Sequence, residues 1–147
     1  MKSVFKTALL VSFVVSLLVA VPTMAGDDEE AILEVIENSY VKAIHAKFNE
    51  AAIMSGFHPA FIMFVKGEEG INHVSIQDWV GRMKGSADPN AEPRNVRFTP
   101  TAVNVTGDAA SVRIELYRDD NLVFTDFFLL YKVDGEWKIV GKVYHRH

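Results

Sequence analysis

The chain has 147 residues, a formal net charge of −4 and no cysteine. This acidic balance disfavours nucleic acid and anionic membrane surfaces as partners, because both call for a basic surface. Without cysteine there is no disulfide, no thiol nucleophile and no lipid-modified cysteine. The stability of the fold must therefore come from a buried core, which a subunit interface could extend.

The first 25 residues have the three parts of a secretion signal. Lys2 and Lys6 form a basic start, residues 8–21 are apolar apart from two serines, and small residues precede Gly26. This apolar run is shorter than the roughly 20 residues of a membrane-spanning helix, which disfavours the alternative of an uncleaved anchor. We expect cleavage after Ala25 and a periplasmic or secreted protein.

Cleavage would remove 25 residues from 147 and leave a single domain, 26–147, of 122 residues with 13 basic and 19 acidic side chains. Its first half predicts three helices. Acidic residues at 27–30 favour a helix start, and apolar residues recur every three or four positions as far as Phe48. Gly56 is a typical helix stop, and Ser75 and Asp78 resemble a capping box. The helices are predicted over 27–48, 50–55 and 76–85.

The rest of the domain predicts strands joined by short turns. The dipeptide Asp134-Gly135 is the strongest hairpin signal in the chain. Helices followed by a long antiparallel meander indicate an α+β fold with the helices packed on one face of the sheet. The strands are predicted over 61–66, 71–74, 96–105, 109–118, 122–133 and 136–145.

The turns also predict which side chains share a face of the sheet. A two-residue turn at Asp134-Gly135, with unbroken pairing beyond it, places Phe128 opposite Gly141 and Asp126 opposite Val143. In the preceding hairpin, a three-residue turn over 119–121 places Ile114 opposite Asp126. A two-residue turn there would oppose two acidic residues, which is unfavourable.

In this register Asp126 and His145 are diagonal neighbours on the apolar face that the helices cover. Such neighbours are close enough for a carboxylate to meet an imidazole, and the pair could transfer a proton or hold a polar ligand group. Asp126 and His145 are therefore the candidate catalytic residues. The alternatives are a purely structural pair, or a pair exposed at the frayed end of the sheet.

The opposite face is too aromatic for a solvent-exposed surface and too polar for a core, which favours a homodimer interface over ordinary exposed aromatics. This predicted face comprises Ser111, Arg113, Glu115, Tyr117, Thr125, Phe127, Leu129, Tyr131, Val140, Lys142 and Tyr144.

Four segments together resemble the nuclear transport factor 2-like (SnoaL-like) superfamily, and within it the branch of putative lumazine-binding proteins. They are Tyr40–Ile44, Phe57-His58-Pro59, Asp126–Leu130 and Val133–Arg146. The resemblance covers nearly all of the predicted domain. It implies N-terminal helices packed on a strongly curved antiparallel sheet, a cone with a cavity at its wide end, and dimerisation through the sheet. It implies little about chemistry, because members include isomerases, dehydratases and transport factors.

Such a cavity gives five further residues a candidate ligand-binding role. His58 would lie at the rim, whereas the aromatic residues would form an apolar wall; the alternatives are a histidine bonded to local backbone and ordinary core packing. The five residues are His58, Tyr40, Trp79, Phe124 and Phe128.

The sequence predicts no metal site and no cofactor, since its five histidines have no metal-ligand spacing and it has no phosphate-binding glycine motif. The favoured function is binding of a small, partly apolar molecule. The alternatives are a cofactor-free isomerase, dehydratase or hydrolase that uses Asp126 and His145, and a structural or accessory dimeric module without a ligand.

Overall fold

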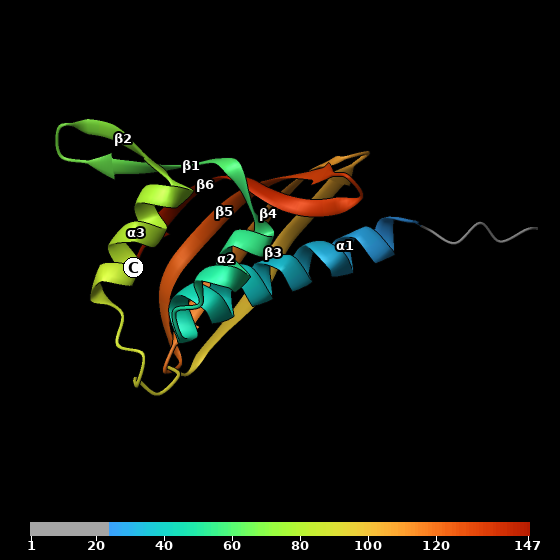
Figure 1. The fold of residues 1–147 in the computed structure, drawn as a ribbon. Helices are drawn as coiled ribbons and strands as arrows, with labels where there is room; N and C mark the ends of the chain where they lie inside the picture. Colours follow the sequence, from blue (N-terminus) through green and yellow to red (C-terminus); the bar gives the residue numbers. More distant parts are fainter. Residues whose placement is uncertain (1–23) are drawn as a thin grey trace, which may run out of the picture.

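The computed structural model describes residues 24–147. A six-stranded sheet bends around α1, η1 and α2, whereas α3 lies beside the hairpin formed by β1 and β2 (Figure 1). The helices are α1 (Met24–Val35), the π-helix η1 (Ile36–Ala46), α2 (Glu50–Gly56) and α3 (Ile76–Ser86). The strands are β1 (Phe57–Gly67), β2 (Gly70–Ser75), β3 (Val96–Thr106), β4 (Ala109–Arg118), β5 (Asn121–Val133) and β6 (Glu136–Arg146).

The sheet has the strand order β2-β1-β6-β5-β4-β3. Its neighbouring strands are antiparallel except β1 and β6, which run parallel. This arrangement confirms the predicted α+β cone, with the parallel pair as a detail that the hairpin signals did not reveal. The predicted secretion signal lies almost entirely outside the described residues and stays a prediction.

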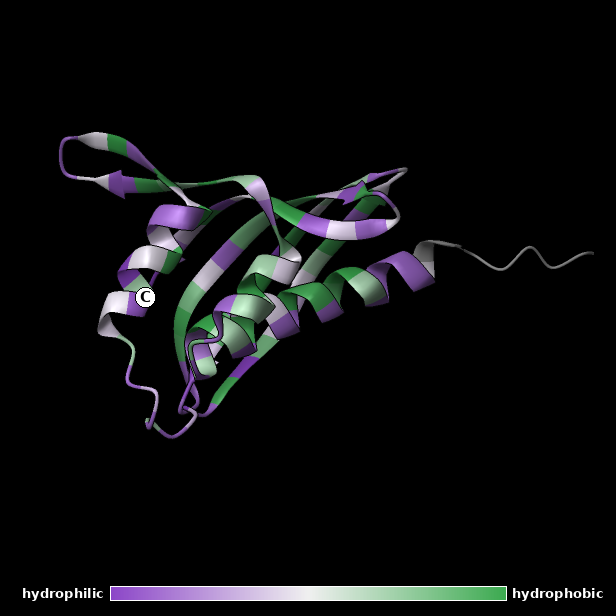
Figure 2. Ribbon diagram, in the orientation of Figure 1, coloured by the Kyte–Doolittle hydropathy of each residue, from purple (hydrophilic) through white to green (hydrophobic). Residues whose placement is uncertain are grey.

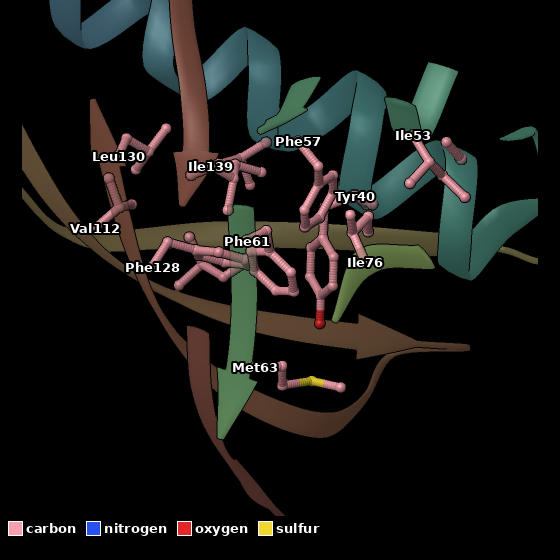
Figure 3. Packing of buried hydrophobic residues seen from close by; sticks show 14 of the residues in the cluster. Tyr40, Ile53, Phe57, Phe61, Met63, Ile76, Val112, Phe128, Leu130 and Ile139 are labelled. Carbon is pink, nitrogen blue, oxygen red and sulfur yellow. The ribbon is translucent and has the colours of Figure 1, made fainter. Parts of the chain in front are cut away.

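The core fills the space between the helices and the inner face of the sheet. Along each element hydrophobic residues alternate with polar ones (Figure 2), so one side of each element is apolar. Phe57 and Phe61 of β1 and Phe128 of β5 lie near Tyr40 of η1, and Val112 of β4 belongs to the same cluster (Figure 3). All five are at most 3% exposed, which is typical of a close-packed interior.

The third helix begins as the capping box predicts. The Ser75 hydroxyl accepts a hydrogen bond from the amide of Asp78 at 3.1 Å and donates one to the Asp78 carboxylate at 2.8 Å. The Ser75 hydroxyl thus satisfies the Asp78 amide, a helix donor that would otherwise lack a partner.

The first helix differs from its prediction, because the α-helix continues beyond Val35 as a π-helix. Its end is marked by a bond from the amide of Lys47 to the carbonyl of Lys42, five residues back. In an α-helix, residues five apart point in directions about 140° apart. The wider π turn instead brings Tyr40 and His45 together, with ring centroids 4.7 Å apart.

The hairpin of β4 and β5 has the predicted pairing but a different turn. Ile114 lies opposite Asp126, as expected. The turn itself has two residues, Asp119 and Asp120, with φ of 48° and 62°, which is the backbone of a type I′ turn. Val123 is the extra residue that restores the register, so the charge conflict is avoided by a bulge rather than by a longer turn.

The hairpin of β5 and β6 breaks the predicted register. Pairing follows the prediction from the turn as far as Leu130 opposite Ile139, but Leu129 then lies opposite Gly141. Val140 is therefore an extra residue in β6, and a one-residue shift sends every later side chain to the other face. The predicted pairs of Phe128 with Gly141 and of Asp126 with Val143 are wrong. Asp126 lies opposite Tyr144.

Candidate functional site

The bulge places Lys142 on the inner face, where it forms a buried ion pair with Asp126. The distance between Lys142 Nζ and Asp126 Oδ1 is 2.6 Å, and the two side chains are 3% and 0% exposed. The Tyr40 hydroxyl donates a hydrogen bond of 2.7 Å to the other carboxylate oxygen, Oδ2. We call these three residues the Lys142–Asp126–Tyr40 cluster. Strands β5 and β6 supply its charges and the π-helix supplies its phenol.

Aromatic rings surround the ammonium group of this cluster. Lys142 Nζ lies 4.2 Å from the ring centroid of Tyr144, 5.2 Å from that of Tyr40 and 6.0 Å from that of Trp79. A cation within about 6 Å of an aromatic face is attracted to it. These rings therefore replace part of the water that Lys142 loses on burial.

Burial changes the acid–base properties of the cluster. Desolvation lowers the pKa of the Lys142 ammonium below its usual range, and the Asp126 carboxylate opposes part of this change. Desolvation and then the negative charge of Asp126 raise the pKa of Tyr40 well above its usual range. Tyr40 therefore stays protonated and keeps its hydroxyl as a donor to Asp126.

An open groove of about 690 Å³ lies next to this cluster. Its walls come from β1, β2, α3 and the end of β6, and we call it the hairpin groove. Tyr144 and Trp79 line the groove and also face Lys142, so they separate the buried ion pair from the open space. The lining residues are Met63, Val65, Asn72, His73, Val74, Trp79, Arg82, Met83, Ser86 and Tyr144.

The structure separates the predicted catalytic pair. His145 is exposed and lies opposite Thr125 on the outer side of the sheet, so the prediction that it shares a face with Asp126 is wrong. The cause is the bulge at Val140. His58 is part-buried, and its Nδ1 accepts a hydrogen bond of 3.1 Å from the amide of Ala60, which matches the alternative of a bond to local backbone.

Of the four predicted aromatic residues, Tyr40 belongs to the cluster and the other three lie around it. Trp79 lines the hairpin groove. Tyr40 and Phe128 are buried core residues whose ring centroids lie 4.9 Å apart. Phe124 is part-buried and packs between His45, at 5.8 Å, and Tyr144, at 5.6 Å. The structure thus brings Tyr40, Trp79, Phe124 and Phe128 to one end of the core.

The sequence interpretation missed Lys142, Tyr144 and His45. The first two were assigned to the outer face because strict alternation was assumed along the last strand. Gly141 was the available signal, since a glycine inside a strand often marks a bulge. His45 was overlooked because α-helical spacing separates it from Tyr40, whereas the π turn brings the two rings together.

His45 gives a prediction for the pH dependence of stability. Desolvation, with smaller effects from the charges of Lys142, Arg118 and Arg94, lowers the pKa of His45 to about 3. In the unfolded chain His45 is protonated as the pH falls through about 6.5, whereas in the folded chain it stays neutral. The folded state therefore loses stability as the pH falls below about 6.5. When the pH is lowered from 7 to 5, the protonation of His45 in the unfolded chain is expected to decrease the free energy of unfolding by about 2 kcal/mol.

Urea unfolding of the wild type and of His45→Leu at both pH values measures this effect, because the variant should lose the dependence. The matched control is His73→Leu, at an exposed histidine, and it should keep the dependence. Equal pH dependence in the wild type and His45→Leu would contradict the prediction.

Two properties of the described part of the chain bear on the class of site. Residues 24–147 contain no cluster of three or more side chains suited to hold a metal ion. Among the same residues, no helix is both long and apolar enough to cross a membrane.

The family model described as putative lumazine-binding matches residues 27–145. This chain belongs to the putative lumazine-binding family. Three solved structures are similar to this chain in fold. An NTF2-like protein of unknown function from Shewanella baltica OS155 is 27% identical, with a TM-score of 0.68, and the match covers 83% of this chain and 95% of that one.

An NTF2-like protein of unknown function from Methylobacillus flagellatus KT is 29% identical, with a TM-score of 0.63 and coverage of 88% and 97%. A structure described as a putative ketosteroid isomerase, from Shewanella frigidimarina NCIMB 400, is 17% identical, with a TM-score of 0.54 and coverage of 78% and 94%. The last shows likeness of fold alone. No curated protein matches the chain significantly. This member of the putative lumazine-binding family therefore has the NTF2-like fold.

Proposed function

We propose that the protein binds a small planar molecule, such as lumazine, in the hairpin groove. The observation that carries the proposal is the buried Lys142–Asp126 ion pair directly behind the aromatic wall of an open groove. A buried ion pair is a poor source of stability, since well-packed apolar residues often serve as well or better. Its position behind Trp79 and Tyr144 supports a role in binding instead.

The chemistry of the wall fits a flat ring with carbonyl groups. Trp79 and Tyr144 offer aromatic surface for stacking or edge contact. The ammonium of Lys142, 4.2 Å from the Tyr144 ring centroid, favours electron-rich oxygen atoms on the groove side. Ligand pockets commonly combine apolar walls with a few polar groups that fix orientation. The name of the family adds independent support for a lumazine-like ring.

The contacts favour this binding role over proton transfer. Both carboxylate oxygens of Asp126 are already engaged, one by Tyr40 and one by Lys142, and the side chain is fully buried. A general base must reach the proton that it removes. Asp126 is therefore best understood as the residue that positions Lys142 and Tyr40.

A fluorescence titration tests the proposal. The chain has two tryptophans, and Trp137→Phe leaves Trp79 as the only tryptophan, which can be excited selectively. We expect lumazine to quench Trp79 emission to saturation. Tyr144→Ala in the same background should weaken binding by at least about fivefold, because stacking of a planar base on an aromatic side chain contributes about 1–3 kcal/mol.

The matched control is Tyr131→Ala, at a tyrosine that is 51% exposed and does not line the groove. It should bind lumazine as tightly as the parent protein. Absence of saturable quenching, or equal losses in the two tyrosine variants, would overturn the proposal.

We also propose that the domain works outside the cytoplasm after cleavage behind Ala25. The basic start, apolar run and small residues of segment 1–25 support this. Cleavage there would remove only Met24 and Ala25 from α1 and keep Asp28, which bonds to Lys132 at 2.7 Å and to Trp137 at 2.9 Å. The intact mass of exported protein should correspond to residues 26–147, and an uncleaved cytoplasmic product would contradict this.

The outer face of the sheet supports the further proposal of a homodimer. Large apolar side chains are exposed there, and a groove of about 420 Å³ runs between them. Monomeric soluble proteins rarely expose a contiguous apolar patch of this kind. The side chains are Phe64, Phe127, Leu129, Tyr131 and Val143, which are 44–57% exposed. Lys142 and Tyr144, assigned to this face from the sequence, lie inside, and Val143 takes their place.

Replacing Leu129 by lysine should dissociate this dimer, because it would bring two charges into an apolar interface. Sedimentation equilibrium should show a dimer for the wild type and a monomer for Leu129→Lys. Glu68→Lys, in the exposed turn between β1 and β2, is the control and should stay dimeric. A monomeric wild type would contradict the proposal.

A further inference from the structure

A second hollow lies on the other side of the end of α3. It has a volume of about 310 Å³ and is bounded by the end of η1 and by the segment that joins α3 to β3. Met83 and Ser86 line both this hollow and the hairpin groove, so the two are neighbours. We call it the π-helix pocket. Its lining residues are Ile44, His45, Ala46, Lys47, Phe48, Met83, Ser86, Ala87, Asp88, Ala91, Glu92 and Arg94.

Positive charge converges on this pocket. Arg94 lines it, and Arg118 lies on the inner face of β4, two residues beyond the buried Leu116. Both are close enough to affect the ionisation of His45, as is Lys142. Among residues 24–147 neither arginine forms an ion pair. In a chain with net charge −4, unpaired arginines beside a hollow indicate a site for an anion.

Acidic residues also border the pocket, but they do not neutralise these arginines. Asp88 and Glu92 belong to the segment between α3 and β3. The Asp88 carboxylate accepts a hydrogen bond of 2.9 Å from the amide of Asn90, and Glu92 is exposed. Neither carboxylate lies within ion-pair distance of Arg94 or Arg118.

Two buried side-chain nitrogen atoms have no hydrogen-bond partner among residues 24–147, one on a residue that lines this pocket and one on a residue outside its lining. They are Nε2 of His45 and Nε of Arg118. A buried donor that is left unsatisfied is destabilising, and such groups in a folded protein call for an explanation. A neutral imidazole can carry its hydrogen on Nε2, so both nitrogen atoms can act as hydrogen-bond donors. An oxyanion supplies several acceptors and a negative charge together.

We propose that the π-helix pocket binds an oxyanion group, a phosphate, sulfate or carboxylate, through His45, Arg94 and Arg118. The inference rests on the proposed function in one respect, since we assign the oxyanion to the ligand whose ring lies in the hairpin groove. The two hollows are neighbours that share Met83 and Ser86, and this is the basis for assigning both to one molecule. The ligand class is then a planar ring with an anionic substituent.

Inorganic phosphate is the probe for the pocket alone. We expect phosphate, but not sodium chloride at equal ionic strength, to shift the imidazole NMR signals of His45 to saturation. Arg118→Gln and Arg94→Gln should each weaken phosphate binding by about tenfold or more, since a hydrogen bond to a charged group contributes about 1.5–3 kcal/mol. Arg94→Gln is the variant less expected to disturb folding, because the bond of Arg94 to Ala46 is made by its backbone amide and is kept in the variant.

The matched control is Arg97→Gln. Arg97 is an exposed arginine on β3 that pairs with Asp120 and stacks on Tyr117, and its loss should leave phosphate binding unchanged. No saturable shift of His45, or equal phosphate affinity in the wild type and Arg94→Gln, would overturn the inference.

The lumazine titration separates this inference from the proposed function. If lumazine quenches Trp79 and phosphate fails to bind, the proposed anion site in the π-helix pocket is wrong, whereas the proposed ring site in the hairpin groove is supported. If phosphate binds through Arg94 and lumazine fails to bind, the assignment of the groove is wrong and the anion site stands. Arg94→Gln should keep its affinity for lumazine, which carries no phosphate.

Discussion

Replacing Lys142 by methionine is expected to lower the free energy of unfolding by about 3–5 kcal/mol. The substitution would remove the only cation that pairs with the fully buried Asp126 among the described residues, and it would leave the Tyr40 hydroxyl as the remaining partner of that carboxylate. An uncompensated charge in the core costs far more than the pair contributes while intact. Urea unfolding at pH 7, followed by circular dichroism, measures the loss.

A second variant separates the charge effect from a packing effect. Asp126→Asn together with Lys142→Met removes both charges and keeps an acceptor for Tyr40, so it should recover more than half of the loss. The control Lys84→Met breaks the exposed ion pair with Glu50 and should cost at most about 1 kcal/mol. If Lys142→Met also lowered the free energy of unfolding by at most about 1 kcal/mol, Lys142 would not be compensating a buried charge on Asp126.

Alanine at Gly56 is expected to lower the free energy of unfolding by about 3 kcal/mol. Gly56 ends α2 where it crosses η1, and an added Cβ would collide with Oγ and Cβ of Ser39 and lie 3.1 Å from Val35. Both Gly56 and Ser39 are buried. The crowded atoms belong to the helix that carries Tyr40, so relaxation would displace that phenol from Asp126. Thermal unfolding measures the change.

Gly81 is the matched control, because it lies within α3 and an added Cβ there would meet nothing within 4 Å. Gly81→Ala should raise stability by about 0.5–1 kcal/mol, the usual gain from alanine in a helix. A neutral effect of Gly56→Ala would show that η1 and α2 are not closely packed.

The sequence was sufficient for the elements whose local signals are strong. The capping box at Ser75 and the hairpin at Asp134-Gly135 both form as predicted, because each depends on a few adjacent residues. The apolar pattern also predicted the inner positions of β4 and the partners of Ile114 and Leu116. These interactions are local or follow directly from the alternation of side chains in a strand.

The candidate site was predicted in part, and the missing part has a physical cause. Asp126 is on the inner face as expected, but its partner depends on one extra residue, Val140, in β6. Strict alternation along β6 does not predict this bulge, and Gly141 was its local signal. The contact of Tyr40 with His45 likewise depends on the π turn, which α-helical periodicity does not predict.

The most direct measurement is a crystal structure of residues 26–147 soaked with lumazine. We predict ring density in van der Waals contact with Trp79 and Tyr144, with its carbonyl oxygens on the side of Lys142 and with the ion pair of Lys142 and Asp126 intact. Density confined to the outer face near Phe127 and Leu129, or no density at saturating lumazine, would contradict binding in the hairpin groove.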